Sequence, residues 1–297
     1  MKLKFNKQQL SNYVTFLSKT LNCSNEAIIK FDLSNQNVST SVHDEGKTWI
    51  RMLTMSDDLF EVVDNENIDK FSICLYGIKN YIDTIKILQS FENSESITID
   101  FKGYEDFKEI NVNEVQTKQD DNLSDLVTRI SDKEILYTDS TKIVFNHADT
   151  NLISQISPYV KTDVEYKYKG MVEKDKLIYS LKIDNISNIC NLLKKQMQNC
   201  IDSAFISIIL DETKNKLIFK TSDSVIEYSI PIDEIVEINN SDGNSVYRFS
   251  FKPVKNILSA VDTAKSISLK FNENNFVNFE ENIGSLNVND FVASIKK

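Results

Sequence analysis

The spacing of apolar residues predicts four amphipathic helices in this chain of 297 residues. In each of them the apolar side chains recur three or four positions apart and so fall on one stripe of a helix. The four stripes are Leu10, Tyr13, Val14, Leu17 and Leu21; Ile78, Ile82, Ile85 and Leu88; Ile186, Ile189, Leu193, Met197 and Cys200; and Val254, Ile257, Leu258 and Val261. Each helix is therefore expected to bury one face and to expose the opposite one.

Between the helices, short alternating runs rich in β-branched and aromatic residues predict strands. The runs are residues 26–33, 70–76, 95–102, 204–210, 216–222, 225–232, 245–251 and 265–272. Turn residues separate many of them, which favours antiparallel pairs, and no long alternation of strand and helix occurs. The pattern predicts an α+β fold with antiparallel sheets.

The chain also repeats itself at a fixed offset. The sequence LSNYVTFLSK at residues 10–19 aligns with ISNICNLLKK at residues 186–195, and GIKNYIDTI from Gly77 aligns with PVKNILSAV from Pro253. Both alignments have an offset of 176 residues. Strand-like residues 95–110 follow the second helix as residues 265–281 follow the fourth. One offset for separate segments argues for a duplicated unit.

The repeat predicts two tandem similar domains with two helices each. The first would comprise residues 1–160, including a connector, and the second residues 161–297. Residues 115–175 have no visible counterpart in the other half. We expect them to finish the first domain and to cross to the second.

Charge is unevenly distributed along the chain. The four helical segments, residues 7–21, 77–91, 185–201 and 251–265, hold nine lysines and only two carboxylates, Asp83 and Asp262. These segments carry a net +7 in a chain of formal charge −10, so the remainder carries −17. Solvated helices usually mix both signs, because each favourable pair stabilises the helix by ~0.2–0.5 kcal/mol. These helices largely lack such pairs.

A polyanion against the exposed helix faces explains this separation, because lysines replace the counterions of phosphates whatever the base sequence. The competing interpretation of each lysine is an ordinary solvated position. The candidate DNA-binding residues are Lys7, Lys19, Lys79, Lys86, Lys194, Lys195, Lys252, Lys255 and Lys265. The chain has only three arginines, the side chain that most often reads bases, which favours binding without sequence readout.

The overall negative charge opposes simple adsorption to DNA. A closed ring with basic helices inside and an acidic sheet outside would satisfy both charge patterns, because it holds DNA by topology.

Candidate catalytic and metal chemistry is sparse. The four cysteines are far apart and only two histidines are available, so we predict no metal site. The Gly-Lys-Thr of residues 46–48 lacks the earlier glycine of a phosphate-binding loop, where Ser41 stands, and predicts a turn between strands. His147 with Asp149 is a two-residue coincidence. We predict no cofactor and no enzymatic activity.

No apolar run has the length of a signal peptide or of a bilayer-spanning helix. We therefore expect a cytoplasmic protein with no membrane partner.

With its two pairs of matching helices, each in its strand context, the sequence resembles the DNA sliding clamps, both the two-domain type of proliferating cell nuclear antigen and the clamps of tailed phages. The resemblance covers about 230 of the 297 residues. It implies helices that line a hole, strands that form a continuous outer sheet, and a homotrimeric ring around double-stranded DNA. It also implies a processivity function for a DNA polymerase, with an ATP-dependent clamp loader as a further partner. The asparagine-, lysine- and isoleucine-rich composition is compatible with a phage or viral source and, in that case, with the host cytoplasm.

Family clamps also bind short partner peptides in an apolar pocket beside the interdomain connection. By position, the resemblance implies that this pocket would draw on Phe291, Val292 and Ile295 near the C-terminal end. The competing interpretation is that an apolar terminal strand belongs to the core.

Three other functions are compatible with parts of the pattern. A monomeric two-domain polymerase accessory subunit would hold DNA by charge alone, and should have a strongly basic exposed face. An enzyme should show nucleotide hydrolysis or metal retention. A single-strand binder should stack bases on aromatic residues, whereas the aromatic residues here fall mainly at alternating strand positions, as in a core.

Overall fold

The computed structural model describes residues 1–44, 48–56, 58–65, 68–90, 95–102, 107–111, 127–129, 133–137, 142–147, 150–156, 166–168, 177–184, 205–211, 216–221, 227–231, 234–237, 245–261, 266–272 and 276–295. The chain divides into two compact units. Unit 1 comprises residues 1–42, 52–118 and 129–167, and unit 2 comprises residues 43–51, 119–128 and 168–297.

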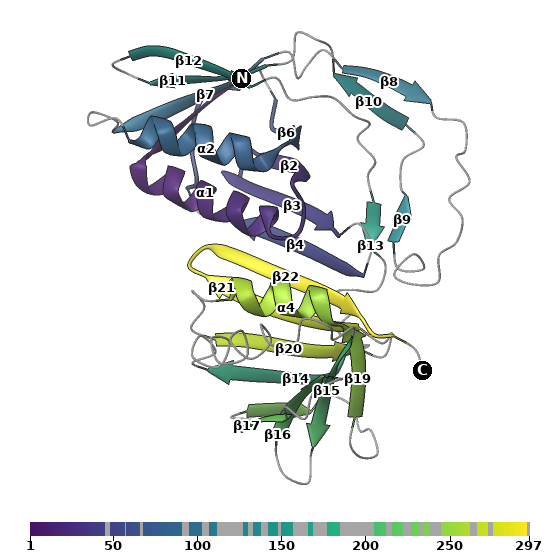
Figure 1. The fold of residues 1–297 in the computed structure, drawn as a ribbon. Coiled ribbons are helices and arrows are strands. Elements are labelled where there is room, and N and C mark those ends of the chain that lie inside the picture. Colours follow the sequence, from purple (N-terminus) through teal and green to yellow (C-terminus); the bar gives the residue numbers. More distant parts are fainter. Residues whose placement is uncertain are drawn as a thin grey trace. The chain divides into compact units, whose positions relative to one another are not determined.

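Unit 1 contains an antiparallel sheet of five strands in the order β12-β11-β7-β1-β5 (Figure 1). These strands are β1 (Lys2–Asn6), β5 (Glu61–Asp64), β7 (Ser96–Lys102), β11 (Lys142–His147) and β12 (Thr150–Ile156). Across the sheet Leu3 faces Ile99 and Ile99 faces Phe145, and all three are fully buried. Their shared face forms one wall of the unit 1 core.

A second run of strands in unit 1 has the order β4-β3-β2-β6. These strands are β2 (Glu26–Asp32), β3 (Asn37–His43), β4 (Trp49–Met55) and β6 (Lys70–Tyr76), of which β3 ends and β4 begins with residues that group with unit 2. An aromatic cluster joins β2, β6 and β7. The ring of Phe31 lies 4.6 Å from that of Phe71 and 5.3 Å from that of Phe101. Such ring pairs contribute to stability beyond their buried area.

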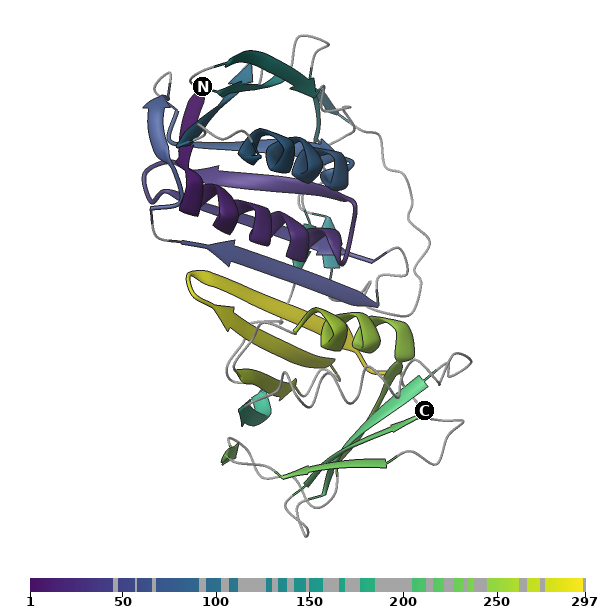
Figure 2. The ribbon, with the colours of Figure 1, turned by 60° about the vertical axis from the view of Figure 1, so that its left-hand side comes forward.

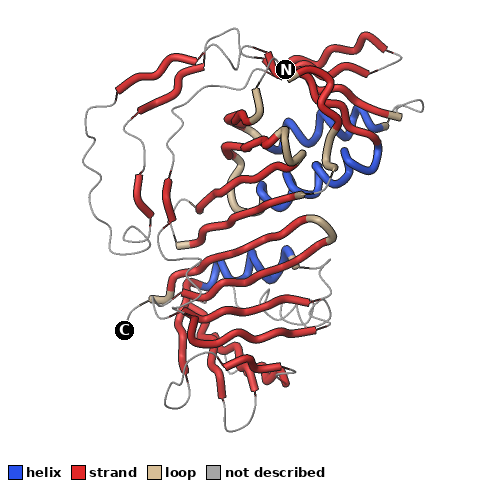
Figure 3. Tube along the Cα trace, turned by 180° about the vertical axis from the view of Figure 1, so that it is seen from behind, coloured by secondary structure: helices blue, strands red, loops and turns tan. Residues whose placement is uncertain are grey.

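Two helices of unit 1, α1 (Lys7–Leu21) and α2 (Ile78–Gln89), lie side by side on one face of these strands (Figures 2 and 3). Tyr13 and Tyr81 pack between them in an edge-on arrangement, with ring centroids 6.2 Å apart and hydroxyl oxygens 3.5 Å apart. Burial raises the pKa of the Tyr81 hydroxyl well above its usual value, which the hydrogen bond to Tyr13 only partly offsets. The Tyr81 hydroxyl therefore remains a neutral group of the core.

The ends of these helices explain why they begin where they do. Asn6 accepts a hydrogen bond from the Gln9 N–H at 2.9 Å, and the Gln9 side chain accepts one from the Asn6 N–H at 2.9 Å, which forms a capping box for α1. The N-terminus of α2 is capped from a distant loop. The N–H groups of Gly77 and Ile78 donate to the Asn25 carbonyl, each at 3.0 Å, and the Lys79 N–H donates to Asn25 Oδ1 at 3.2 Å.

We expect Asn25→Ala to lower the free energy of unfolding by about 1 kcal/mol, because the Lys79 N–H loses its side-chain acceptor. Urea unfolding followed by circular dichroism measures the change. Asn80→Ala is the matched control: Asn80 is exposed on the same helix, and alanine there should be neutral or slightly stabilising. An equal loss in both variants would contradict the capping role.

Unit 2 contains an antiparallel sheet in the order β18-β14-β20-β21-β22, and residues Trp49–Arg51 of β4 lie next to β22. Its second sheet has the order β17-β16-β15-β19. The strands are β14 (Leu177–Asp184), β15 (Phe205–Asp211), β16 (Lys216–Thr221), β17 (Glu227–Pro231), β18 (Glu234–Glu237), β19 (Ser245–Ser250), β20 (Ser266–Asn272), β21 (Phe276–Ile283) and β22 (Leu286–Ala293). Helix α4 (Phe251–Ala260) packs on this unit with Val254, Ile257 and Leu258 buried.

The strand orders confirm the predicted duplication. The order β12-β11-β7-β1-β5 in unit 1 corresponds to β22-β21-β20-β14-β18 in unit 2, and β4-β3-β2-β6 corresponds to β17-β16-β15-β19. Helix α2 between β6 and β7 likewise corresponds to α4 between β19 and β20. The α+β class with antiparallel sheets is confirmed, and the predicted helix of residues 186–200 lies outside the described residues.

One strand of the predicted repeat is wrong. The sequence pattern matched residues 95–110, which end within β8 (Phe107–Asn111), with residues 265–281. In the structure β7 pairs with β11, and β8 pairs with β10 (Lys133–Tyr137). Residues 103–141 are therefore an insertion between neighbouring strands, and residues 142–156 have counterparts in β21 and β22.

A further short pair consists of β9 (Val127–Arg129) and β13 (Tyr166–Tyr168).

The helix ends add two details. Helix α4 begins at Phe251, the first residue of the predicted segment, so Pro253 lies inside its first turn, whereas the aligned Gly77 is the N-cap of α2. Proline is tolerated there because its position needs no N–H donor. In α1 the buried stripe includes Phe16, while Val14 and Leu21 are only half-buried.

Candidate nucleic-acid interface

The outward faces of α1 and α2 form a polar surface with few carboxylates, which we call the unit 1 helix surface. Because the apolar stripes of both helices face the core, the residues between the stripes are exposed. This surface consists of Lys7, Gln8, Ser11, Lys79, Asn80, Asp83, Lys86 and Ile87. It carries three lysines and one aspartate. Ile87 is 60% exposed and is an unusually open apolar side chain on it.

Helix α4 of unit 2 offers a smaller set of cations. Lys252 is exposed, and Lys255 is half-buried with its Nζ 5.8 Å from the ring centroid of Phe251. Its aliphatic stem thus covers apolar surface while its charge stays at the edge. The ten residues of α4 include no carboxylate.

The structure reduces the set of lysines predicted to contact DNA. Lys7, Lys79, Lys86 and Lys252 are exposed, and Lys255 is partly so. Lys194, Lys195 and Lys265 lie outside the described residues.

Lys19 corrects the prediction, because its residue is only 6% exposed. It follows the buried Phe16 by three positions and so falls at the edge of the buried stripe of α1. Its charge lies in the last turn of the helix, where the helix dipole stabilises a cation. Including Phe16 in the predicted stripe would have identified Lys19 as buried.

The chemistry of these surfaces is suited to phosphates rather than to base edges. Lysine provides a mobile point charge, and the side chains between the lysines are mostly neutral hydrogen-bonding groups. Of the three arginines, Arg51 is buried and so cannot form a fork with a guanine, and Arg248 lies on β19 rather than on a described helix and stacks over the ring of Phe205 at 4.1 Å.

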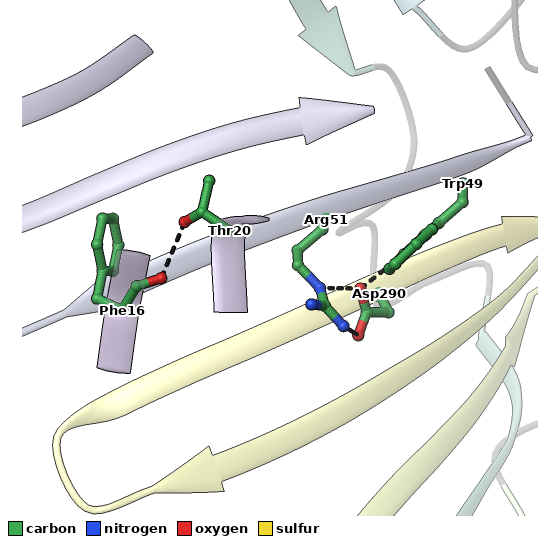
Figure 4. Close-up of polar contacts among 5 residues, drawn as sticks. All are labelled: Phe16, Thr20, Trp49, Arg51 and Asp290. Carbon is green, nitrogen blue, oxygen red and sulfur yellow. Dashed lines mark hydrogen bonds and ion pairs between the residues drawn. The ribbon is translucent and has the colours of Figure 1, made fainter. Parts of the chain in front are cut away.

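Sequence reasoning missed a buried polar cluster in unit 2, shown in Figure 4. Asp290 of β22 accepts hydrogen bonds from Arg51 Nε at 2.6 Å and from Arg51 Nη2 at 2.8 Å. It also accepts one from Trp49 Nε1 at 2.7 Å. The Arg51 and Asp290 side chains are 0% and 3% exposed, and the guanidinium lies 4.8 Å from the Trp49 ring centroid.

A signal for this cluster was present in the sequence. In β22 the alternation places Asp290 on the same face as Val288 and Val292, which are fully buried. A carboxylate at an inward position requires a buried partner, and inward-pointing Arg51 in β4 provides it. Bidentate pairing fixes both strands at one register, because a slip of one residue would turn either side chain to the other face.

The residues predicted for a peptide pocket are not on one face. Phe291 and Val292 are adjacent on β22 and point to opposite faces, and both are buried. The ring of Phe291 packs edge-on against Phe276 at 5.7 Å. These two side chains belong to the core and cannot together line one exposed pocket. Ile295 is half-exposed, and its N–H donates to the Arg248 carbonyl at 2.7 Å.

Of the turn predicted at residues 46–48, residues 46 and 47 lie outside the described residues, and only its flanks can be placed. Asp44 Oδ1 accepts hydrogen bonds from the N–H groups of Thr48 and Trp49, each at 2.8 Å. Within the described part of the chain, no three His, Cys, Asp or Glu side chains come together as a metal site requires. In the same residues, no helix is both long and apolar enough to cross a membrane.

No protein-family model matches the chain, and no curated protein matches its sequence. Its fold does match solved structures over almost its whole length. A PCNA2–PCNA3 complex from Sulfolobus tokodaii contains a chain that is 10% identical, with a TM-score of 0.61 and 99% of each chain covered.

Proliferating Cellular Nuclear Antigen from Entamoeba histolytica is 10% identical, with a TM-score of 0.63 and 99% and 98% covered. PCNA from Thermococcus kodakaraensis is 11% identical, with a TM-score of 0.62 and 99% of both chains covered. At this identity the similarity shows the fold, which is that of the DNA sliding clamps.

Proposed function

We propose, from the sliding-clamp fold, that this chain is a polymerase processivity factor that closes into a ring around duplex DNA. Three copies would form the ring, and lysines on its helices would contact phosphates without reading sequence. The chain performs no chemical step in this proposal. A DNA polymerase would be tethered to it, and an ATP-dependent loader would open it.

The observation that supports ring closure best is the pairing of equivalent strand edges. Strand β22 lies next to residues Trp49–Arg51 of β4, where the Ala293 N–H donates to the Thr48 carbonyl at 3.2 Å. The counterparts of these two strands, β12 and β17, end their sheets in the described part of the chain. If β12 of one copy pairs with β17 of the next, the same geometry repeats from copy to copy. Such head-to-tail contacts close into rings and cover exposed edges.

The charge pattern supports an encircled polyanion. The described helices expose mostly lysine and neutral polar groups, in a chain of formal charge −10. Adsorption through the whole-protein field would be repulsive, whereas a ring needs only weak local contacts to hold DNA.

We expect light scattering at micromolar concentration to give three times the chain mass of 34.1 kDa. Rings assembled on nicked circular DNA should remain bound through a high-salt wash and should leave when the circle is linearised, because topology rather than charge holds them. Linear DNA of the same length is the control.

The alternative function is a monomeric polymerase accessory subunit that binds DNA electrostatically. A particle with the mass of one chain that binds linear DNA tightly at low salt would favour that alternative. Retention that does not depend on the closure of the DNA circle would also count against the ring.

A further inference from the structure

On the exposed side of α2, a single carboxylate lies between two lysines. Asp83 follows Lys79 by four residues and precedes Lys86 by three, so all three side chains share one side of the helix. All three residues are exposed. Neither α1 nor α4 contains a carboxylate, which makes Asp83 the one acidic residue of the three described helices.

Apart from its favourable spacing from two lysines, nothing in the local structure explains this aspartate. It is in the middle of α2 rather than in the first turn, where the helix dipole would stabilise an acidic side chain. Its carboxylate makes no hydrogen bond or ion pair closer than 4 Å with the described residues. The N-terminus of α2 is capped by Asn25, so Asp83 has no capping role.

We infer that Asp83 weakens the hold of the unit 1 helix surface on duplex DNA. This inference rests on the proposed function, since it assumes that this surface meets phosphates. A carboxylate within one helical turn of two lysines competes with phosphate for both cations and repels the phosphate itself. A clamp that must slide needs such weak contacts, because every phosphate held firmly must be released before the ring advances.

Removing the charge should strengthen DNA binding. With Asp83→Asn we expect the affinity for a 30-base-pair fluorescent duplex at 0.05 M salt to rise about three- to tenfold per chain, from loss of one screened repulsion at close range. The slope of log K against log salt should become steeper by up to about 1. Fluorescence anisotropy across a salt series measures both quantities.

The matched control is Asp69→Asn, which removes the same charge at an exposed position between β5 and β6, outside the helices. A second variant, Lys79→Gln with Lys86→Gln, tests the surface itself. If this lysine variant binds more weakly and only Asp83→Asn binds more tightly, the inference holds. If the lysine variant weakens binding but Asp83→Asn equals Asp69→Asn, Asp83 has no special role although the proposed surface stands.

If neither the lysine variant nor Asp83→Asn changes binding, the DNA-contacting role of this surface in the proposed function is wrong, and the inference is overturned with it. A circular dichroism spectrum and an unfolding curve for each variant separate altered binding from altered folding.

Discussion

Replacing Asp290 by alanine is expected to lower the free energy of unfolding by about 3–5 kcal/mol, a large part of the roughly 5–15 kcal/mol that stabilises a typical folded protein. The substitution leaves the Arg51 guanidinium fully buried without its carboxylate and leaves Trp49 Nε1 without an acceptor. Removing the carboxylate partner of a buried cation costs far more than the net value of the pair.

Urea unfolding measures this loss, and the protein has a built-in probe because Trp49 is its only tryptophan. Its fluorescence should report on the environment of β22, while circular dichroism follows the whole chain. Asp69→Ala is the control and should change stability by less than about 0.5 kcal/mol. A loss below about 1 kcal/mol for Asp290→Ala would mean that water or another side chain compensates Arg51.

A double variant separates the charge from the packing. Arg51→Met with Asp290→Leu replaces the pair by apolar side chains of similar size, so it should recover most of the stability lost in Asp290→Ala. If the wild type forms the proposed ring and the double variant folds stably without forming it, the pair serves to fix the strand register rather than to hold the unit together.

The repeat suggests why a charged pair is useful at this position. Asp290 faces Phe279 across the hairpin of β21 and β22, and the corresponding residue of β12 is Ser154, which faces Phe145. The edge that would pair between copies of the chain therefore lacks the carboxylate present at the edge that pairs within the chain. A weaker contact between copies would suit the proposed ring, which would have to open while each chain stays folded.

Apolar periodicity predicted the helices well, because burial decides which positions are apolar. All four residues predicted for α2 are buried, and so are those predicted for α4. Periodicity gives no information about which strand pairs with which, however. This is why β8 was matched with β21, although β11 is the neighbour of β7 in the sheet and the counterpart of β21.

The candidate site was predicted from charge, and charge alone does not reveal accessibility. Lys7, Lys79, Lys86 and Lys252 are exposed. Lys19 is not, because the apolar stripe on α1 is wide enough to cover its position. The pair of Arg51 and Asp290 was missed for a related reason. Pairs between distant strands follow from topology. The only sequence signal for this pair was the position of Asp290 on the inward face of β22.

Reversing the exposed lysines should have the largest effect on function. The variant Lys79→Glu, Lys86→Glu and Lys252→Glu removes three exposed cations per chain while leaving the buried faces of α2 and α4 unchanged. If each lysine replaces about one counterion, the affinity for duplex DNA at 0.15 M salt should fall by about 100-fold or more per chain, and the salt slope should become shallower by about 3. Stimulation of processive synthesis should be lost as well.

The variant must keep its oligomeric state for this result to be informative, so its mass is measured alongside DNA binding. The control for net charge reverses three lysines away from the helices, the exposed Lys70 and Lys102 and the half-exposed Lys4. Each forms an ion pair with a carboxylate, so an unfolding curve is measured for this variant as well. If both triple variants lose affinity equally, the effect is due to the field of the whole protein. If only the helix variant loses it, the contacts with phosphate are made by α2 and α4, because equal changes in total charge then have unequal consequences.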